Sequence, residues 1–139
     1  LQTVRQLGIG LVPYSPLARG LFSNSLDLRS LADDDFRRTL PRNQGEHAEN
    51  NAKLVADFAL LAKDKSCTPA QLALAWVLAQ GDDIIPIPGT KKRKYLEENA
   101  GAVDTALSGT ELKAIENILA KYPNVGARYS EGAMALVNH

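Results

Sequence analysis

The chain has 139 residues with 16 basic and 16 acidic side chains, so its formal net charge is zero and its length suits one domain. A neutral chain with interspersed charges has no overall attraction for nucleic acid or an anionic membrane, and 45% hydrophobic residues argue against disorder. One cysteine and two histidines exclude a disulfide framework and a zinc site. We therefore expect a protein of a reducing, cytoplasmic compartment with no nucleic-acid or membrane partner.

The N-terminal third combines a helix end, a strand and a long loop. Residues 1–7 have the pattern of the last turns of an amphipathic helix, which Gly8 closes in a left-handed conformation. Because no Met precedes this helix, we expect the sequence to begin within a structure. Residues 9–14 (IGLVPY) predict a buried parallel strand. Residues 17–46 show no sustained period and predict a long loop, a length that is typical of functional or disordered segments.

The middle of the chain predicts two helices and a second strand. Apolar residues at helical spacing predict a helix over residues 48–64. Thr68, Pro69 and Gln71 form a capping box with proline at the first helical position, which predicts a helix over residues 68–80. The apolar side of that helix is expected to carry Leu72, Ala75, Trp76 and Ala79. After Gly81, residues 84–87 (IIPI) predict a strand, although Pro86 cannot donate to a ladder.

The C-terminal third predicts two more helices. Residues 91–99 have helix-forming composition with Thr90 as N-cap. Ser108 and Glu111 form another capping box, and Pro123 ends the helix that follows. Residues 124–139 predict an irregular tail.

The glycines at positions 8 and 10 resemble the start of a dinucleotide fingerprint but do not fit one. Pro13 stands where the third glycine belongs, and the pair precedes the strand instead of following it. The sequence has no nucleophile elbow, no P-loop and no zinc motif. Cys67 beside a helix start is interpreted as an inert buried thiol.

Two segments that follow the predicted strands carry candidate binding chemistry. Residues 14–20 (YSPLARG) offer an aromatic face, a hydroxyl and an arginine, with a tight turn and a surface arginine as the alternative interpretation. Residues 89–94 (GTKKRK) place four cations at a predicted helix N-terminus, where they oppose the helix dipole by about 0.3–1 kcal/mol each. A phosphate site explains that arrangement. A solvated basic face or a nuclear-localisation-like patch is the alternative.

The two segments are expected to lie together. Two parallel strands joined by a helical crossover place both carboxyl ends at one edge of the sheet, where a ligand with two separated phosphate groups fits. A phosphorylated dinucleotide has that chemistry.

Residues 14–20 (YSPLARG) and residues 87–99 (IPGTKKRKYLEEN), about seventy residues apart, resemble segments of the aldo-keto reductases, as do residues 68–80 (TPAQLALAWVLAQ) between them. The resemblance implies an α/β chain that is the C-terminal part of a (β/α)8 TIM barrel, comprising the last two β/α units and the C-terminal helix. Residues 1–139 are then one C-terminal fragment of an aldo-keto reductase domain, incomplete as given. The family reduces aldehydes and ketones with NADPH, which implies NADP(H) as cofactor and a small-molecule carbonyl compound as substrate.

The resemblance also assigns cofactor contacts. Tyr14 matches the residue that stacks on the nicotinamide, and Arg128, Tyr129 and the long loop match regions that shape the substrate pocket. The pyrophosphate is implied to lie along Ser15, Pro16, Leu17, Ala18 and Arg19; the 2′-phosphate at Gly89, Thr90 and Lys91; and the adenine at Glu98 and Asn99, with Tyr95 where many members have Arg or Gln.

The family's catalytic Tyr, Asp, Lys and His are borne on earlier strands, so the resemblance implies no catalytic residue in this chain. We expect the chain alone to be inactive and the intact enzyme to transfer hydride to a carbonyl carbon. Two alternatives stay open: a non-enzymatic NADP-binding or regulatory module, and a helical interaction domain whose basic run binds a partner protein or nucleic acid.

Overall fold

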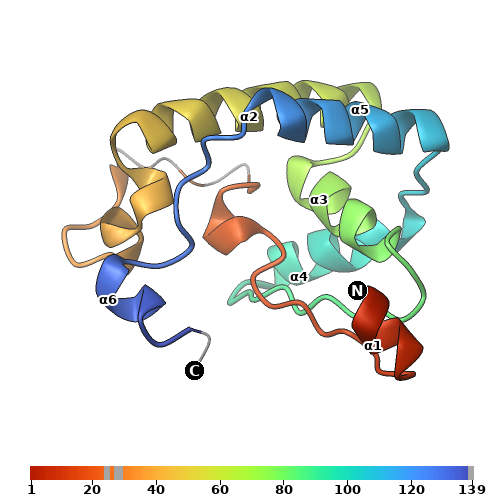
Figure 1. The fold of residues 1–139 in the computed structure, drawn as a ribbon. Helices are drawn as coiled ribbons and strands as arrows, with labels where there is room; N and C mark the ends of the chain where they lie inside the picture. Colours follow the sequence, from red (N-terminus) through yellow and green to blue (C-terminus); the bar gives the residue numbers. More distant parts are fainter. Residues whose placement is uncertain (24–25, 27–29, 138–139) are drawn as a thin grey trace. The chain divides into compact units, whose positions relative to one another are not determined.

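Helices form most of the computed structural model, which describes residues 1–23, 26 and 30–137 (Figure 1). The chain divides into two compact units, residues 1–26 with 59–113 and residues 27–58 with 114–139, and the boundary falls within two long helices. The α-helices are α1 (Gln2–Gln6), α2 (Gly45–Asp64), α3 (Pro69–Leu78), α4 (Arg93–Ala100), α5 (Gly109–Lys121) and α6 (Glu131–Met134). Short 3-10 helices are η1 (Ala18–Gly20), η3 (Phe36–Thr39), η4 (Pro41–Asn43) and η5 (Gly101–Asp104).

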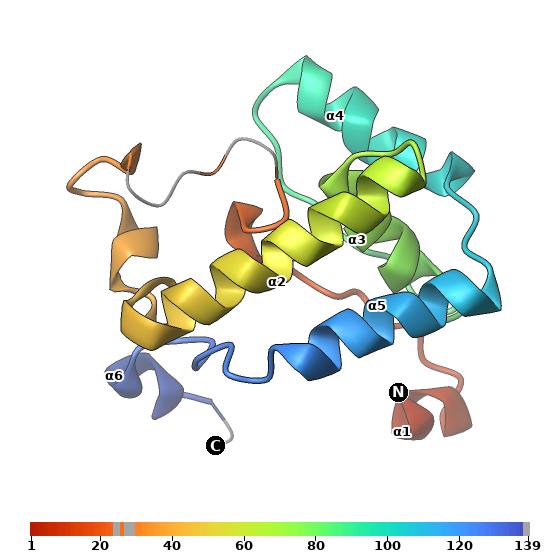
Figure 2. The same ribbon diagram turned by 90° about the horizontal axis from the view of Figure 1, so that it is seen from above.

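Helix α3 is the buried centre of the first unit, and its start confirms the predicted capping box. The Thr68 hydroxyl accepts a hydrogen bond from the Gln71 N–H at 3.1 Å, and the Gln71 side chain accepts one from the Thr68 N–H at 3.1 Å. α3 contacts α4 and η5, beside which it lies in Figure 2. More of the α3 surface is buried than the predicted apolar side of Leu72, Ala75, Trp76 and Ala79. Of these four residues, Ala79 is exposed. The buried residues are Pro69, Ala70, Leu72, Ala73, Leu74 and Ala75.

The two predicted strands pair in parallel, as expected, but only through isolated bridges. Leu11 bridges Ile84 and Tyr14 bridges Ile87. Hydrogen bonds run from the Leu11 N–H to the Asp83 carbonyl at 2.7 Å and from the Ile85 N–H to the Leu11 carbonyl at 2.9 Å. The predictions of regular strands, and of a buried strand over residues 9–14, are wrong. Prolines in both segments remove ladder donors, and among the described residues the pair has no further strand beside it.

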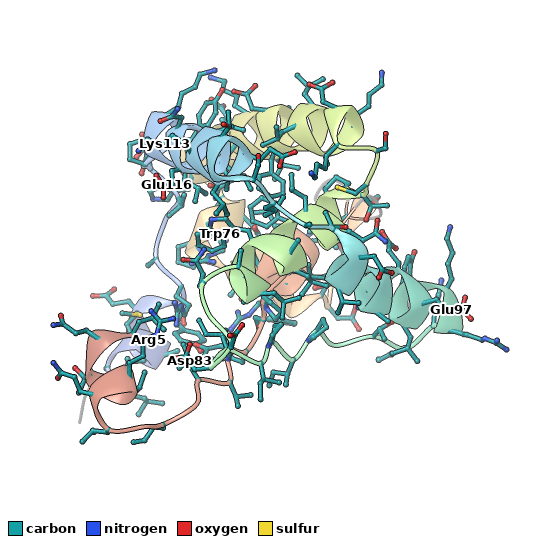
Figure 3. All side chains as sticks on the ribbon, turned by 90° about the vertical axis from the view of Figure 1, so that its right-hand side faces the viewer. Arg5, Trp76, Asp83, Glu97, Lys113 and Glu116 are labelled. Atoms are coloured by element: carbon teal, nitrogen blue, oxygen red, sulfur yellow. The ribbon has the colours of Figure 1, made fainter. Side chains whose placement is uncertain are left out.

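An arginine clamp joins α1 to the turn before the second segment. The Arg5 guanidinium donates to both carboxylate oxygens of Asp83, at 2.9 and 3.0 Å, and to the Gln80 carbonyl (Figure 3). These bonds lower the pKa of the Asp83 carboxyl. Gly81 has φ +148°, and a Cβ there would overlap the Arg5 guanidinium, so the clamp requires glycine. α1 and the left-handed Gly8, at φ 66°, confirm the predicted helix end.

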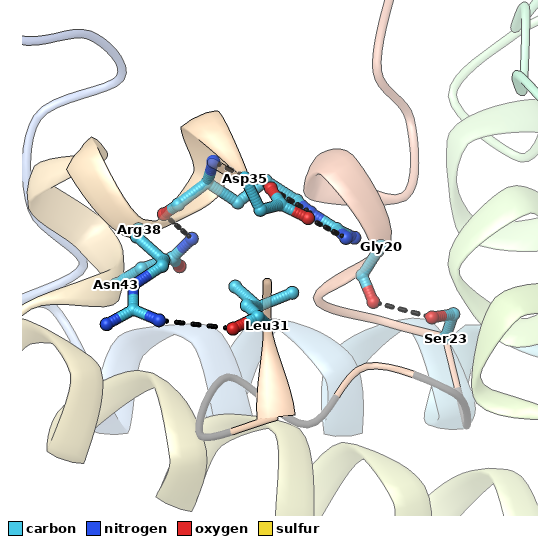
Figure 4. A network of polar contacts seen from close by, with 7 residues as sticks. Gly20, Ser23, Leu31, Asp35, Arg38 and Asn43 are labelled. Atoms are coloured by element: carbon cyan, nitrogen blue, oxygen red, sulfur yellow. Dashed lines mark hydrogen bonds and ion pairs between the residues drawn. The ribbon is translucent and has the colours of Figure 1, made fainter. Parts of the chain in front are cut away.

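Side-chain hydrogen bonds order part of the predicted long loop, within the second unit. Asp35 caps η3 by accepting from the Arg37 N–H at 2.9 Å, and its carboxylate pairs with the Arg37 guanidinium (Figure 4). This pairing lowers the pKa of Asp35 to about 2. Arg38 donates to the Leu31 carbonyl at 3.1 Å. The prediction of a long loop over residues 17–46 is therefore wrong for residues 18–20 (η1) and 36–43, and α2 already begins at Gly45. Residues 24, 25 and 27–29 of that loop lie outside the described part.

A buried asparagine holds the second unit together. Asn51 on α2 is 1% exposed, and its amide donates to the Arg42 carbonyl at 2.8 Å and the Val125 carbonyl at 3.0 Å. The predicted helix over residues 48–64 is confirmed and begins earlier, at Gly45. The predicted irregular tail contains α6, which corrects that interpretation for residues 131–134.

Helix α5 begins with the second predicted capping box, which is confirmed. The Ser108 N–H donates to the Glu111 carboxylate at 2.7 Å, and the Glu111 N–H donates to the Ser108 hydroxyl at 3.3 Å. Lys65 adds an ion pair to Glu111 at 2.7 Å. The lysine bond, followed by those from Ser108, lowers the pKa of Glu111 to about 2.

This carboxylate predicts an acid-sensitive stability. A carboxyl whose pKa is lower in the folded chain stabilises the fold above its unfolded pKa, and the contribution disappears as the pH falls through the folded value. Urea unfolding of Glu111→Gln between about pH 5 and pH 2 is expected to show a shallower loss of stability than the unchanged chain. Glu49→Gln, an exposed change on α2, is the control. Equal pH slopes for the Glu111 variant and the unchanged chain would contradict this assignment.

Candidate functional site

The parallel bridge between Tyr14 and Ile87 brings the ends of the two segments together. Ile87 donates its N–H to the Pro13 carbonyl at 3.3 Å, one residue before Tyr14. Because the segments run in the same direction, the chain leaves both at the same edge of the pair. Residues 15–20 and 88–94, which carry the sequence-predicted binding groups, therefore start from neighbouring positions in the first unit.

The first of these, the loop of residues 14–20, has an unusual backbone. Ser15, Ala18 and Arg19 have φ of 51°, 48° and 59°, the left-handed region that non-glycine residues rarely adopt. Each such residue costs about 1–3 kcal/mol and persists only where surrounding structure imposes it. The Ala18 N–H donates to the Ser15 carbonyl at 2.9 Å and the Gly20 N–H to the Leu17 carbonyl at 3.0 Å, which closes the loop tightly. Such conformations concentrate at ligand-binding turns.

The second segment differs from its predicted form. Helix α4 starts at Arg93 with Lys92 as N-cap, so the prediction that Thr90 caps a helix beginning at Lys91 is wrong. Thr90 instead accepts from the Lys92 N–H at 3.3 Å and donates to the Lys92 carbonyl at 3.2 Å, which makes a turn before the helix. Lys91 and Lys92 thus precede the first helical turn, which reduces the expected conflict with the helix dipole.

Side chains of the second segment separate into exposed cations and half-buried neighbours. The four cations at positions 91–94 are all exposed. Arg93 donates to Glu97 at 2.7 Å, and the Lys92 ammonium lies 5.9 Å from the centre of the Tyr95 ring. Tyr95, Glu98 and Asn99 are half-buried on one side of α4, since residues three and four apart share a helix face. The segment therefore places exposed positive charge next to a half-buried polar face of α4.

Sequence reasoning missed one polar cluster, which lies in the second unit. The Asp57 carboxylate accepts from the Lys121 ammonium and from the Tyr122 hydroxyl, both at 2.8 Å. These bonds lower the pKa of Asp57 and raise that of Lys121. Since the phenol and the ammonium both donate to one carboxylate, the cluster ties the end of α5 to α2. Asp57 and Lys121 are 64 positions apart in the chain, so no local sequence pattern indicates that they pair.

Metal and thiol chemistry find no support in the part of the chain that the structure describes. No group of three or more His, Cys, Asp or Glu side chains there is placed to hold a metal ion. Cys67 is a free cysteine that is half-buried and not buried as predicted, and its partial burial raises the pKa of the thiol. Within the described ranges, no helix is long and apolar enough to cross a membrane.

Comparison with known proteins gives concordant results. The model of the Aldo/keto reductase family matches residues 1–120. A fission yeast protein (Schizosaccharomyces pombe), "Aldo-keto reductase yakc [NADP(+)]", is 43% identical over 96% of this chain and 39% of its own length. A soybean (Glycine max) protein, "Probable aldo-keto reductase 1", is 43% identical over 92% of this chain and 37% of its own length. The chain thus spans about two fifths of these relatives.

A solved structure shows the same relationship in three dimensions. The glycerol dehydrogenase AKR11B4 from Gluconobacter oxydans matches with a TM-score of 0.74 at 26% identity. The match covers 88% of this chain and 37% of that enzyme.

Proposed function

We propose that this chain, which belongs to the aldo/keto reductase family, is the C-terminal, NADP(H)-holding part of a TIM-barrel oxidoreductase that reduces aldehydes or ketones to alcohols. The family's fold agrees with the parallel pairing and crossover helix α3. The observation that supports the proposal best is the bridge between Tyr14 and Ile87, from which both candidate nucleotide-binding segments depart.

The residues present fit a phosphorylated dinucleotide. Lys91 is an exposed cation within the turn that the Thr90 and Lys92 hydrogen bonds make, next to Gly89, and a 2′-phosphate requires such a charge. The strained loop of Ser15, Pro16, Leu17, Ala18 and Arg19 presents closely spaced backbone groups and a guanidinium for a pyrophosphate. Tyr14, half exposed, offers a ring face for stacking, while Tyr95, Glu98 and Asn99 line the side of α4 proposed for adenine. When bound, NADPH supplies the hydride for carbonyl reduction.

Lys91→Ala is expected to lower the affinity of the chain for NADPH about tenfold, because a charge-assisted bond to phosphate contributes roughly 1.5–3 kcal/mol and solvent screens part of it. Affinity for NADH, which lacks the 2′-phosphate, should change less than twofold. Fluorescence titration measures both ligands, and Lys63→Ala, an exposed lysine of the same unit, is the matched control.

The same titrations separate this proposal from its alternatives. Equal affinity of the unchanged chain for NADPH and NADH would contradict the role of Lys91. Adding a reactive aldehyde tests the enzymatic part. The chain alone is expected to bind NADPH without oxidising it, because the family's catalytic residues find no match in it; clear turnover would contradict the assignment of no catalytic residue to this chain.

A further inference from the structure

Few backbone hydrogen bonds set the register of the two paired segments, residues 9–14 and 84–87. In the described part of the chain, three such bonds join them, from the Leu11 N–H to the Asp83 carbonyl, from the Ile85 N–H to the Leu11 carbonyl and from the Ile87 N–H to the Pro13 carbonyl. Pro13 itself lacks the N–H that would face the second segment, because residues 11 and 13 of an extended chain point the same way. The backbone alone therefore fixes the offset of the segments only weakly.

Arg5 adds a side-chain attachment where the pairing begins (Figure 3). Its guanidinium donates to both carboxylate oxygens of Asp83, at 2.9 and 3.0 Å, and to the Gln80 carbonyl. The backbone carbonyl of the same Asp83 accepts the Leu11 N–H at 2.7 Å. Because a guanidinium that donates to both oxygens of one carboxylate fixes its orientation as well as its distance, Asp83 is held in place where it pairs with the first segment.

The backbone of Arg5 is tied to the first segment. The Gly8 N–H donates to the Arg5 carbonyl at 3.1 Å and the Ile9 N–H to the Val4 carbonyl at 2.9 Å, so α1 leads into residues 9–14 through a hydrogen-bonded turn. Arg5 thus connects to one segment through its backbone and to the other through its side chain. These two attachments fix how far along each other the segments lie.

We propose that Arg5 is a positioning residue for the nucleotide, because the offset between the segments sets the spacing of the two binding elements that follow them. These elements are the loop of residues 15–20 and the turn of residues 89–92. The inference rests on the function proposed above, in which one dinucleotide contacts both elements. Asp83 comes before the second segment and the turn comes after it, so Arg5 acts from the opposite end of the segment. A ligand that contacts both elements depends on the offset, whereas a ligand of the turn alone does not.

Amide hydrogen exchange of the chain, followed by NMR, tests whether Arg5 holds the register. Arg5→Gln is expected to lower the protection of the Leu11 and Ile85 N–H groups about fivefold, an effect in the range of a partly exposed ion pair with good geometry. The amides of α3 should keep their protection. Asp83→Asn removes the same ion pair from the other side and should have the same effect.

Arg38→Gln is the matched control for the loss of an arginine. Arg38 also donates to a carboxylate, that of Asp33 at 2.9 Å, and to a carbonyl, that of Leu31 at 3.1 Å, but it does so within the second unit. Its replacement should leave the protection of Leu11 and Ile85 unchanged. Unchanged protection in Arg5→Gln, or an equal loss in Arg38→Gln, would overturn the inference.

Two ligands then separate positioning from general stability. Arg5→Gln should lower the affinity for NADPH about fivefold, because only the fraction of molecules in the native register presents both elements at the required spacing. The affinity for adenosine 2′-monophosphate, a probe of the turn and α4 alone, should change less than about twofold. An equal loss for both ligands would make Arg5 a general stabiliser and contradict the proposal. If the unchanged chain binds neither ligand, the proposed function and this inference both fail; if Arg5→Gln binds NADPH as tightly as the unchanged chain, the positioning role alone fails.

Discussion

Replacing Leu72 with alanine is expected to lower the free energy of unfolding by about 2–5 kcal/mol, the range for buried leucines in close-packed cores. Leu72 is 1% exposed on α3, the helix that contacts both α4 and η5. The substitution removes apolar contacts and leaves a cavity that its helical neighbours cannot fill without moving. Because α4 carries the proposed adenine side chains, NADPH affinity should fall as well.

The control makes the same chemical change where the side chain is in water. Leu60 lies on α2 in the same unit and is 62% exposed, so Leu60→Ala should change stability by no more than about 0.5 kcal/mol. Urea unfolding followed by circular dichroism measures both variants. Equal losses at positions 60 and 72 would show that α3 is not the centre of this unit's core.

Asn51→Ala is expected to destabilise the second unit by roughly 1–3 kcal/mol, because the variant loses two hydrogen bonds of a buried amide, each of which contributes about 0.5–1.5 kcal/mol. The asparagine amide is the donor to two carbonyls, those of Arg42 and Val125, which come from segments more than eighty residues apart. Without it, the 3-10 helices before α2 and the chain after α5 lose their common attachment.

Two further variants isolate the cause of the Asn51 effect. Asn117→Ala on α5 is the exposed control and should be close to neutral. Asn51→Leu preserves volume but donates no hydrogen bond, so it should be at least as destabilising as Asn51→Ala. Recovery of stability in Asn51→Leu would show that packing, and not the pair of hydrogen bonds, is what Asn51 contributes.

Features that depend on residues within one helical turn were predictable from the sequence. Each capping box joins residues three positions apart, so a short sequence pattern is enough to predict where the helix starts. The two pairs are Thr68 with Gln71 and Ser108 with Glu111. The parallel pairing was also predictable, because a short apolar run, a crossover helix and a second apolar run leave few alternatives. The residues proposed to hold nucleotide were identified through family resemblance, and their roles stay predictions.

Apart from the parallel pairing, only the tertiary structure decided what depends on residues distant in the chain. It reduced two predicted strands to bridges and left Val12 and Ile85 exposed, because a strand is complete only when neighbours supply bonds on both edges. It moved the start of α4 to Arg93, which changes where the four cations stand. It also joined Arg5 to Asp83 and Asn51 to Val125, pairs separated by more than seventy residues. The sequence alone determined where the capped helices start and that the total charge is neutral. Long-range packing, for which no local sequence pattern exists, determined the position of the charged and apolar groups in space.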